Sequence, residues 1–176
     1  MTELACVTGR FQPVHDQHLE LFELAMRRAE HLVVAVTNPD PSARQEEATS
    51  AHRHRPSANP FTYYERSRLL GAALAEHGLT ARTTIVPFDL TRPAHWSDYV
   101  PLHALHLVRA YSAWERHKAE LLADAGYQVE LMEGDPETRL SSSDIRSQIE
   151  QGRGWESLVP GSIVPVLHAV LNGAQS

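Results

Sequence analysis

The chain has 176 residues, a formal net charge of −6 and a hydrophobic fraction of 42%, values that predict one globular domain spanning residues 1–176. The negative charge argues against a nucleic-acid partner, and the single cysteine, Cys6, excludes an intramolecular disulfide. No apolar run approaches about 18 residues, and the first residues carry no basic signal segment. We therefore expect a cytoplasmic protein without a membrane partner.

The first 30 residues predict a strand, a loop and an amphipathic helix. An apolar strand at 4–7 runs into Gly9, and a polar loop with Arg10, His15 and His18 leads into the helix. Such a junction places free backbone N–H groups and the positive end of a helix at the tip of a sheet. Open α/β sheets bind their ligands there, and arginine and histidine add donors suited to a polyphosphate.

The rest of the chain alternates strand and helix patterns. The continuous apolar run Leu-Val-Val-Ala-Val within 31–37 is typical of a strand buried on both faces, as in a parallel sheet. We expect further strands at 83–86, 106–111 and 127–132, and helices at 62–77, 114–125, 162–171 and from the serine run 141–143 to about Gly152. The alternation predicts an α/β fold, a single Rossmann-like, doubly wound domain with a mostly parallel five-stranded sheet.

A polar segment at 38–60 separates the second strand from the next helix, and it has four basic residues at 52–55. It is either a solvated insertion or a lid whose basic residues close over a triphosphate. After it, Thr62 and Glu65 have the spacing of a capping box. We expect Thr62, Glu65 and the adjacent Arg66 to be structural rather than catalytic.

Three segments together resemble one enzyme family. The string from Gly9 to His15, Gly-Arg-Phe-Gln-Pro-Val-His, with His18 after it, resembles the start of nucleotidyltransferases whose hallmark is His-x-Gly-His. The longer string is similar to that of nicotinamide-mononucleotide adenylyltransferases of the archaeal type. The segments 59–66 (Asn-Pro-Phe-Thr-Tyr-Tyr-Glu-Arg) and 140–146 (Leu-Ser-Ser-Ser-Asp-Ile-Arg) resemble two further motifs of the same enzymes.

The resemblance implies roles for individual residues. Catalytic contacts with the phosphates are implied for His15, His18, Arg10 and Arg146. Nucleotide contacts are implied for Gly9, Phe11, Gln12, Ser141, Ser142 and Ser143. Acceptor contacts are implied for Asn59 and Trp96, whose indole would stack on a cationic nicotinamide ring. Taken alone, the histidine pair could lie on the surface, and the serine run could be an ordinary helix N-cap.

The implied reaction is nucleotidyl transfer, in which a phosphate monoester attacks the α-phosphorus of a nucleoside triphosphate and pyrophosphate leaves. The leading hypothesis is transfer of AMP from ATP to nicotinamide mononucleotide, giving NAD. We expect Mg²⁺ to arrive with the triphosphate, because the sequence shows no carboxylate cluster for a dedicated metal site. The expected partners are ATP or another nucleoside triphosphate and a small phosphorylated acceptor, and the sequence leaves a homo-oligomer open.

Four departures from the family pattern keep another substrate open. Gln17 stands where the hallmark has glycine, Thr91 and Pro93 stand near family asparagines, and Trp114 lies where the family has a Gly-Asn turn. They motivate an alternative, a cytidylyl- or adenylyltransferase that acts on a different phosphate or phosphonate. A non-catalytic nucleotide-binding regulator is a third hypothesis, against which the retained histidines and arginines of the motifs argue.

Overall fold

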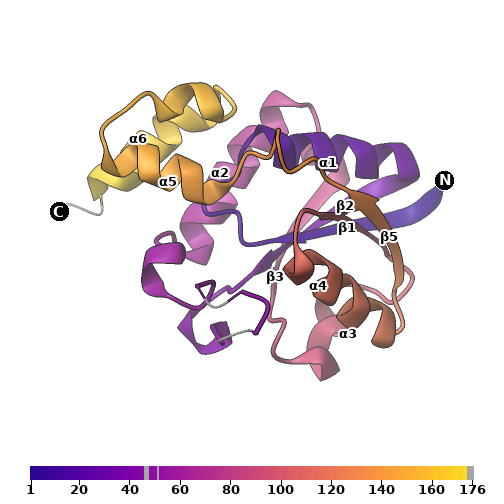
Figure 1. The fold of residues 1–176 in the computed structure, drawn as a ribbon. Helices are drawn as coiled ribbons and strands as arrows, with labels where there is room; N and C mark the ends of the chain where they lie inside the picture. Colours follow the sequence, from indigo (N-terminus) through magenta and orange to yellow (C-terminus); the bar gives the residue numbers. More distant parts are fainter. Residues whose placement is uncertain (46–47, 51, 174–176) are drawn as a thin grey trace.

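The computed structural model describes residues 1–45, 48–50 and 52–173, and a sheet with strictly parallel pairing lies at its centre (Figure 1). Within these residues the five strands lie in the order β3-β2-β1-β4-β5. Their bounds are β1 (Thr2–Gly9), β2 (Ala29–Thr37), β3 (Thr83–Phe88), β4 (Leu105–Ala110) and β5 (Gln128–Glu133). The predicted α/β class and parallel sheet are confirmed.

The helices fall close to their predicted positions. They are α1 (Asp16–Arg28), α2 (Tyr63–Glu76), α3 (Trp96–Tyr99), α4 (Ala113–Asp124), α5 (Ser142–Glu150) and α6 (Ile163–Gly173). Pro165 lies in the first turn of α6, where its missing N–H breaks no helical hydrogen bond. The short α3 was not predicted. Within the described ranges, no helix has both the length and the apolar character needed to cross a membrane.

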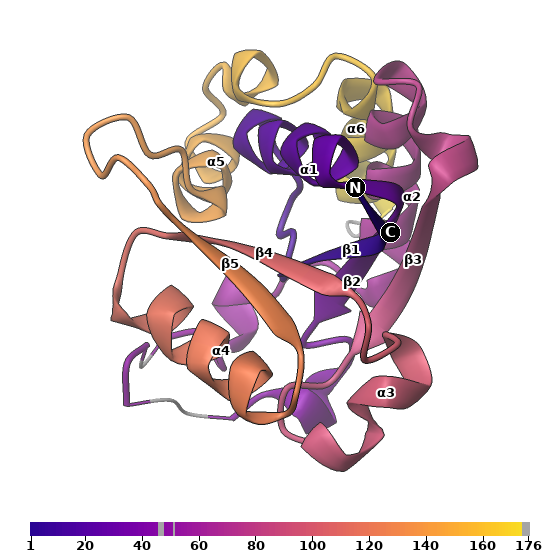
Figure 2. The same ribbon diagram turned by 90° about the vertical axis from the view of Figure 1, so that its right-hand side faces the viewer.

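Helices cover both faces of the sheet, as Figure 2 shows. Side chains alternate along a strand, so Ala5 and Val7 of β1 face a core shared with α1, α2, α5 and α6. The intervening Cys6 faces a second core, which is shared with α3 and α4. The β2 run 32–36 is divided between the same two cores, which explains why it is apolar throughout.

The strand order places a topological switch point between β1 and β4. From β1 the chain continues through α1 to β2 on one side, whereas β4 pairs with the other side of β1. Helix α1 follows β1 on one face of the sheet, and α4 follows β4 on the opposite face. Ligands of doubly wound sheets bind at the carboxyl ends of the strands at such a point.

Candidate active site

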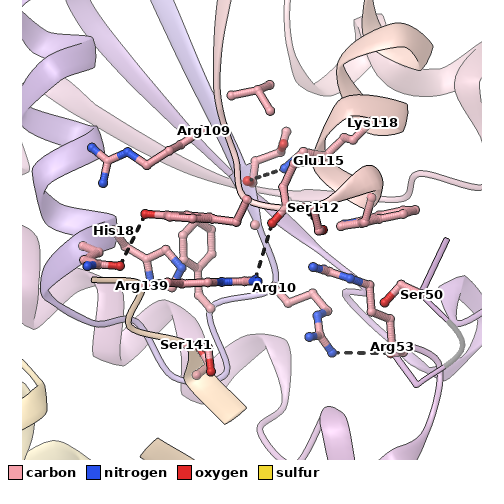
Figure 3. A pocket seen from close by; sticks show the side chains of 18 of the residues that line it. Arg10, His18, Ser50, Arg53, Arg109, Ser112, Glu115, Lys118, Arg139 and Ser141 are labelled. Carbon is pink, nitrogen blue, oxygen red and sulfur yellow. Dashed lines mark hydrogen bonds and ion pairs between the residues drawn. The ribbon is translucent and has the colours of Figure 1, made fainter. Parts of the chain in front are cut away.

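A cavity of about 570 Å³ opens at this switch point (Figure 3). Its walls come from the carboxyl ends of β1 and β4, the N-terminal halves of α1 and α4, residues 48–50 and 52–53, and residues 139–143 around the start of α5. This volume suits a small-molecule ligand. The cavity brings together predicted site residues far apart in the sequence, namely Gly9, Arg10, Phe11, Gln12, His15, His18, Ser141, Ser142 and Ser143.

The two histidines form a stacked pair at the start of α1. His15 is the N-cap residue, and its backbone N–H donates to Nδ1 of His18 at 3.1 Å. The ring centroids lie 3.7 Å apart. Burial lowers the pKa of His15 to about 3 and the pKa of His18 well below its ordinary value, so both rings are neutral at pH 7. Because Nδ1 of His18 accepts, its neutral ring carries the proton on Nε2 and can donate it to a ligand.

Phe11 and Gly9 support this pair. The Phe11 backbone has a φ of +52°, and its ring meets the His18 ring edge-on at 4.8 Å. A Cβ at Gly9 would lie 2.9 Å from the Phe11 ring, so a glycine is needed there for the close approach. The Phe11 ring is buried, which leaves its backbone as the part available to a nucleotide.

Gln12 and Asn59, predicted to bind ligand, have amides engaged with the protein. The Gln12 amide accepts from the N–H of Phe61 at 2.9 Å and donates to its carbonyl at 3.0 Å. Asn59 donates to the carbonyls of Arg53 at 2.7 Å and Arg55 at 2.9 Å, and it is not among the residues that line the cavity. Both side chains fasten the segment that precedes α2; Gln12 still lines the cavity, whereas Asn59 lies outside it and away from the predicted acceptor contact.

Trp96 does not reach the cavity. Its side chain is 2% exposed, its indole stacks on Phe88 with centroids 5.3 Å apart, and Nε1 donates to the carbonyl of Asp89 at 2.7 Å. Trp96 instead borders a separate cavity of about 370 Å³, so the structure does not place its indole beside the histidines, where the predicted stacking role would need it. The tryptophan that lines the cavity is Trp114.

The serine motif caps α5 and also faces the cavity. Ser141 and Asp144 form a capping box, and the Ser142 hydroxyl donates to the carbonyl of Pro13 at 2.8 Å. The structural interpretation of the run is therefore confirmed, while its N-terminal end lies where an anion could use the helix dipole. Arg146 stands back from the cavity and donates to the carbonyl of Gln12 at 2.8 Å.

Arg10 lines the cavity and is anchored at its edge. Its Nη1 donates to the carbonyl of Ala58 at 3.0 Å. Burial and three neighbouring arginines lower its pKa to about 9, which leaves it charged at neutral pH. One of these neighbours, Arg66, is buried and donates to the carbonyls of Arg10 and Thr37 at 2.9 and 2.8 Å. Arg66 thus joins the ends of β1 and β2, which confirms its predicted structural role.

Gln17, the residue in place of the family glycine, connects α1 to the segment before α5. Its Nε2 donates to the carbonyl of Thr138, and its Oε1 accepts from the N–H of Leu140, both at 2.7 Å. The Tyr111 hydroxyl lies 3.4 Å from the same oxygen. The side chain therefore holds the 138–140 segment against the cavity instead of leaving space there.

Several lining residues escaped the sequence analysis. They are Arg109, Tyr111, Glu115, Lys118 and Arg139. Arg53, which also lines the cavity, belongs to the basic run at 52–55, for which a lid over a triphosphate was one of the two interpretations. A signal for Lys118 was present, because Trp114, Lys118 and Leu122 follow one another at helical spacing and are all buried. A lysine on the buried side of a helix needs a polar partner, and Lys118 donates to the carbonyl of Thr8 at 3.1 Å.

The cavity is strongly cationic although the chain is acidic. Among the residues that the structure describes, the walls carry five lysine or arginine side chains and one carboxylate, that of Glu115. Of the five, Arg109 is paired with Glu20 at 3.2 Å, and Arg139 is paired with Glu115 at 3.4 Å. A concentration of positive charge in a concave site favours a polyanionic ligand.

Comparisons with known proteins agree with this site. The family model described as cytidylyltransferase-like matches residues 6–148. Phosphonoformate cytidylyltransferase of Streptomyces viridochromogenes is 36% identical over 162 residues, covering 92% of this chain and 88% of that protein. Nicotinamide-nucleotide adenylyltransferase of Thermococcus onnurineus is 28% identical over 171 residues, covering 97% of this chain and 84% of that one.

A solved structure shares the fold. The bifunctional NMN adenylyltransferase/ADP ribose pyrophosphatase from Francisella tularensis superposes with a TM-score of 0.66 at 13% identity, over 90% of this chain. This chain spans 45% of that longer protein. The family match, by contrast, includes both the histidine loop and the serine motif, which meet at the cavity. The chain therefore belongs to the cytidylyltransferase-like family and is a nucleotidyltransferase.

Proposed function

We propose that this enzyme transfers a cytidylyl group from CTP to a small phosphonate or phosphate acceptor, with release of pyrophosphate. The observation that carries the proposal is the position of Trp96, whose indole stacks on Phe88 and lies outside the cavity that holds the histidines. A relative at 36% identity named for cytidylyl transfer to phosphonoformate supports the same choice.

The proposed reaction needs no strong base. A phosphonate or phosphate oxygen, already anionic near neutral pH, forms a bond to the α-phosphorus while the bond to the bridging β-oxygen breaks. The Nε2–H of His18 donates to an α-phosphate oxygen, where charge develops in the transition state. The Ser143 hydroxyl and the N-terminus of α5 hold the leaving pyrophosphate, and Arg10 neutralises charge between the reacting groups.

Magnesium belongs to the substrate in this proposal. Within residues 1–45, 48–50 and 52–173 the cavity wall offers one carboxylate, Glu115, and this group is engaged by Arg139 and by the Ser112 hydroxyl. The donor set does not fit a protein cage for Mg²⁺, which prefers carboxylate and water oxygens. We propose that the triphosphate brings the ion in and that this chain's cations bind the remaining phosphate oxygens.

Adenylyl transfer from ATP to nicotinamide mononucleotide is the second candidate. It is favoured by the relative of that name at 28% identity and by the resemblance of the string from Gly9 to His15 to archaeal-type adenylyltransferases. A nicotinamide ring would have to find a stacking partner other than Trp96.

The two candidates are separated by pyrophosphate release measured with CTP and ATP against phosphonoformate, methylphosphonate and nicotinamide mononucleotide. We expect the highest kcat/KM with CTP and a small phosphonate. Equal or higher kcat/KM with ATP and nicotinamide mononucleotide would reverse the order of the candidates. A purified His18→Ala variant serves as the inactive control in every pair.

A further inference from the structure

One wall of the cavity carries two cations that are not used by the histidine and serine motifs. Lys118 comes from α4, and Arg53 comes from the segment between β2 and α2. Figure 3 shows the two side chains on the same side of the cavity as Glu115, across from His18 and Ser141.

Each of these two cations has at least one N–H donor for which the described residues offer no hydrogen-bond partner. The ammonium of Lys118 has three N–H donors, and among the described residues one partner is found, the carbonyl of Thr8. The Nε of Arg53 is buried and has no hydrogen-bond partner within the described part of the chain. The nearby Glu115 is already engaged by Arg139 and Ser112. Buried cations without matched anions are costly, so a bound anion would stabilise this wall.

Contacts with residues from several elements fix the position of Arg53. Its backbone carbonyl accepts from Asn59 at 2.7 Å and lies 3.4 Å from Nδ2 of Asn38 and 3.5 Å from Nη1 of Arg10. Its guanidinium lies over the Trp114 ring, 4.9 Å from the centroid. Contacts to both backbone and side chain therefore hold Arg53 in the cavity wall, which is unlike a freely solvated surface arginine.

The two ends of the cavity arise from opposite faces of the sheet. The histidines and the serine motif belong to α1 and α5, which cover one face, whereas Lys118 belongs to α4 on the other. A triphosphate held by α1 and α5 leaves the α4 wall to the acceptor. An acceptor whose phosphorus group reaches the α-phosphorus would present its far end to that wall.

We propose that Arg53 and Lys118 form a subsite for a second anionic group of the acceptor, such as a carboxylate attached close to its phosphonate or phosphate. The proposal rests on the proposed function and specifies its substrate class. It predicts that the enzyme selects small acceptors with two anionic groups over acceptors with the phosphorus group alone.

Binding experiments without turnover test this subsite. Calorimetry on protein saturated with α,β-methylene CTP compares phosphonoformate, which carries a carboxylate, with methylphosphonate, which does not. The test variants are Arg53→Met and Lys118→Met. The matched controls are Arg55→Met, an exposed arginine of the same segment, and Arg116→Met, an exposed arginine of α4 paired with Glu133.

We expect each test variant to weaken phosphonoformate binding about 10- to 100-fold, the range for a lost charge-assisted hydrogen bond. Methylphosphonate and the CTP analogue should bind within about threefold of the parent, and both controls should resemble the parent. Equal losses for the two phosphonates, a loss confined to the CTP analogue, or no loss at all would overturn the subsite. Absence of phosphonoformate binding to the parent would overturn it as well.

The same titrations separate the subsite from the reaction. If the parent transfers no nucleotidyl group to any acceptor yet shows this binding pattern, the subsite stands and the proposed function fails. If it cytidylylates methylphosphonate as well as phosphonoformate, and the variants do not change that ratio, the function stands and the subsite fails.

Proton uptake on acceptor binding distinguishes a lysine that contacts the bound anion from a lysine with a purely structural role. Burial and Arg53 lower the pKa of Lys118 to about 8, while Glu115 and Cys6 oppose the shift. The other titratable groups nearby, His18 and His106, are neutral because their pKa values are lowered. A bound anion raises the pKa of Lys118, so the parent should take up roughly half a proton at pH 8. Lys118→Met should lose this uptake, measured in buffers of different ionisation enthalpy, and unchanged uptake would contradict the assignment.

Discussion

His18 owes its chemical character to a backbone contact at the start of α1. The N–H of His15 donates to Nδ1 of His18, and burial keeps the ring neutral. The side chain therefore presents a neutral Nε2–H donor to the cavity over the whole physiological pH range. Such a donor can stabilise the charge that develops on a phosphate oxygen, and its own protonation state stays the same over this pH range.

The first prediction concerns this donor. His18→Ala should lower kcat by about 10²- to 10³-fold, since one transition-state contact in a closed site is lost. The measurement is steady-state pyrophosphate release, with folding checked by circular dichroism. His31→Ala is the control, because His31 lies on β2 and contacts Thr84 outside the cavity. Unchanged turnover in a folded His18→Ala protein would contradict the assigned role.

The second prediction concerns Trp96, which has the contacts of a core residue. Trp96→Ala should reduce the free energy of unfolding by about 3–5 kcal/mol, the usual cost of truncating a buried aromatic side chain. The KM for the acceptor should change less than about threefold at temperatures where the variant is folded. Urea denaturation and steady-state kinetics measure the two effects. A large rise in acceptor KM with unchanged stability would restore Trp96 to the acceptor site.

At the scale of the elements, α1, the segment 138–140 and α5 are joined into one unit. Gln17 makes two hydrogen bonds of 2.7 Å to Thr138 and Leu140, and the Ser142 hydroxyl returns to Pro13. Arg139 lies in this segment, with its guanidinium 4.9 Å from the centroid of Tyr111. The N-terminus of α5 is thereby fixed relative to the histidine loop, as a site that binds one triphosphate requires.

The third prediction follows from this coupling. Gln17→Gly, which restores the residue of the family hallmark, should cost about 1–3 kcal/mol of stability because two hydrogen bonds to the backbone of 138–140 are lost and glycine weakens a helix. It should also raise the KM for the triphosphate more than the KM for the acceptor. Thermal unfolding and kinetics with each substrate varied in turn measure these effects. A variant more stable than the parent would show that Gln17 is not a fastening residue.

Over the whole molecule, buried histidines make stability depend on pH. The pKa values of His15 and His106 are lowered from 6.5 to about 3, chiefly by burial. Below pH 6.5 the unfolded chain takes up protons at these positions while the folded chain does not. The free energy of unfolding should therefore fall as the pH drops from 6.5 toward 3.

The fourth prediction uses His106, whose two ring nitrogens lack hydrogen-bond partners in the described structure. His106→Leu should leave stability at pH 7 equal or higher, because an unpaired buried polar group is removed. Between pH 6.5 and 5 the free energy of unfolding of this variant should fall by about 2 kcal/mol less than that of the parent. The variant lacks one histidine that takes up a proton in the unfolded chain. Urea denaturation at pH 7 and 5 measures this, with exposed His103→Leu as control. Parallel pH profiles for the parent and His106→Leu would contradict the assignment.

Much of the fold could be predicted because its signals are local. Strand and helix periods, the Thr62–Glu65 capping box and the glycine at the end of β1 depend on neighbouring residues, and the structure confirms them. The motifs around His15 and Ser141 are likewise short strings, and the family match spans both. The short helix α3 lacked such a signal, because four residues are too few to show a helical period.

The sequence by itself determined the parallel α/β fold, the two motif loops and the nucleotidyltransferase family. Only the tertiary structure decided which side chains face the cavity, because that depends on strand order and on the sheet face that each helix covers. Trp96 turns into the core and Trp114 into the cavity, although both follow a strand. Arg53 and Lys118, 65 positions apart in the sequence, line the same cavity because α4 packs against β1, and no local pattern encodes that arrangement.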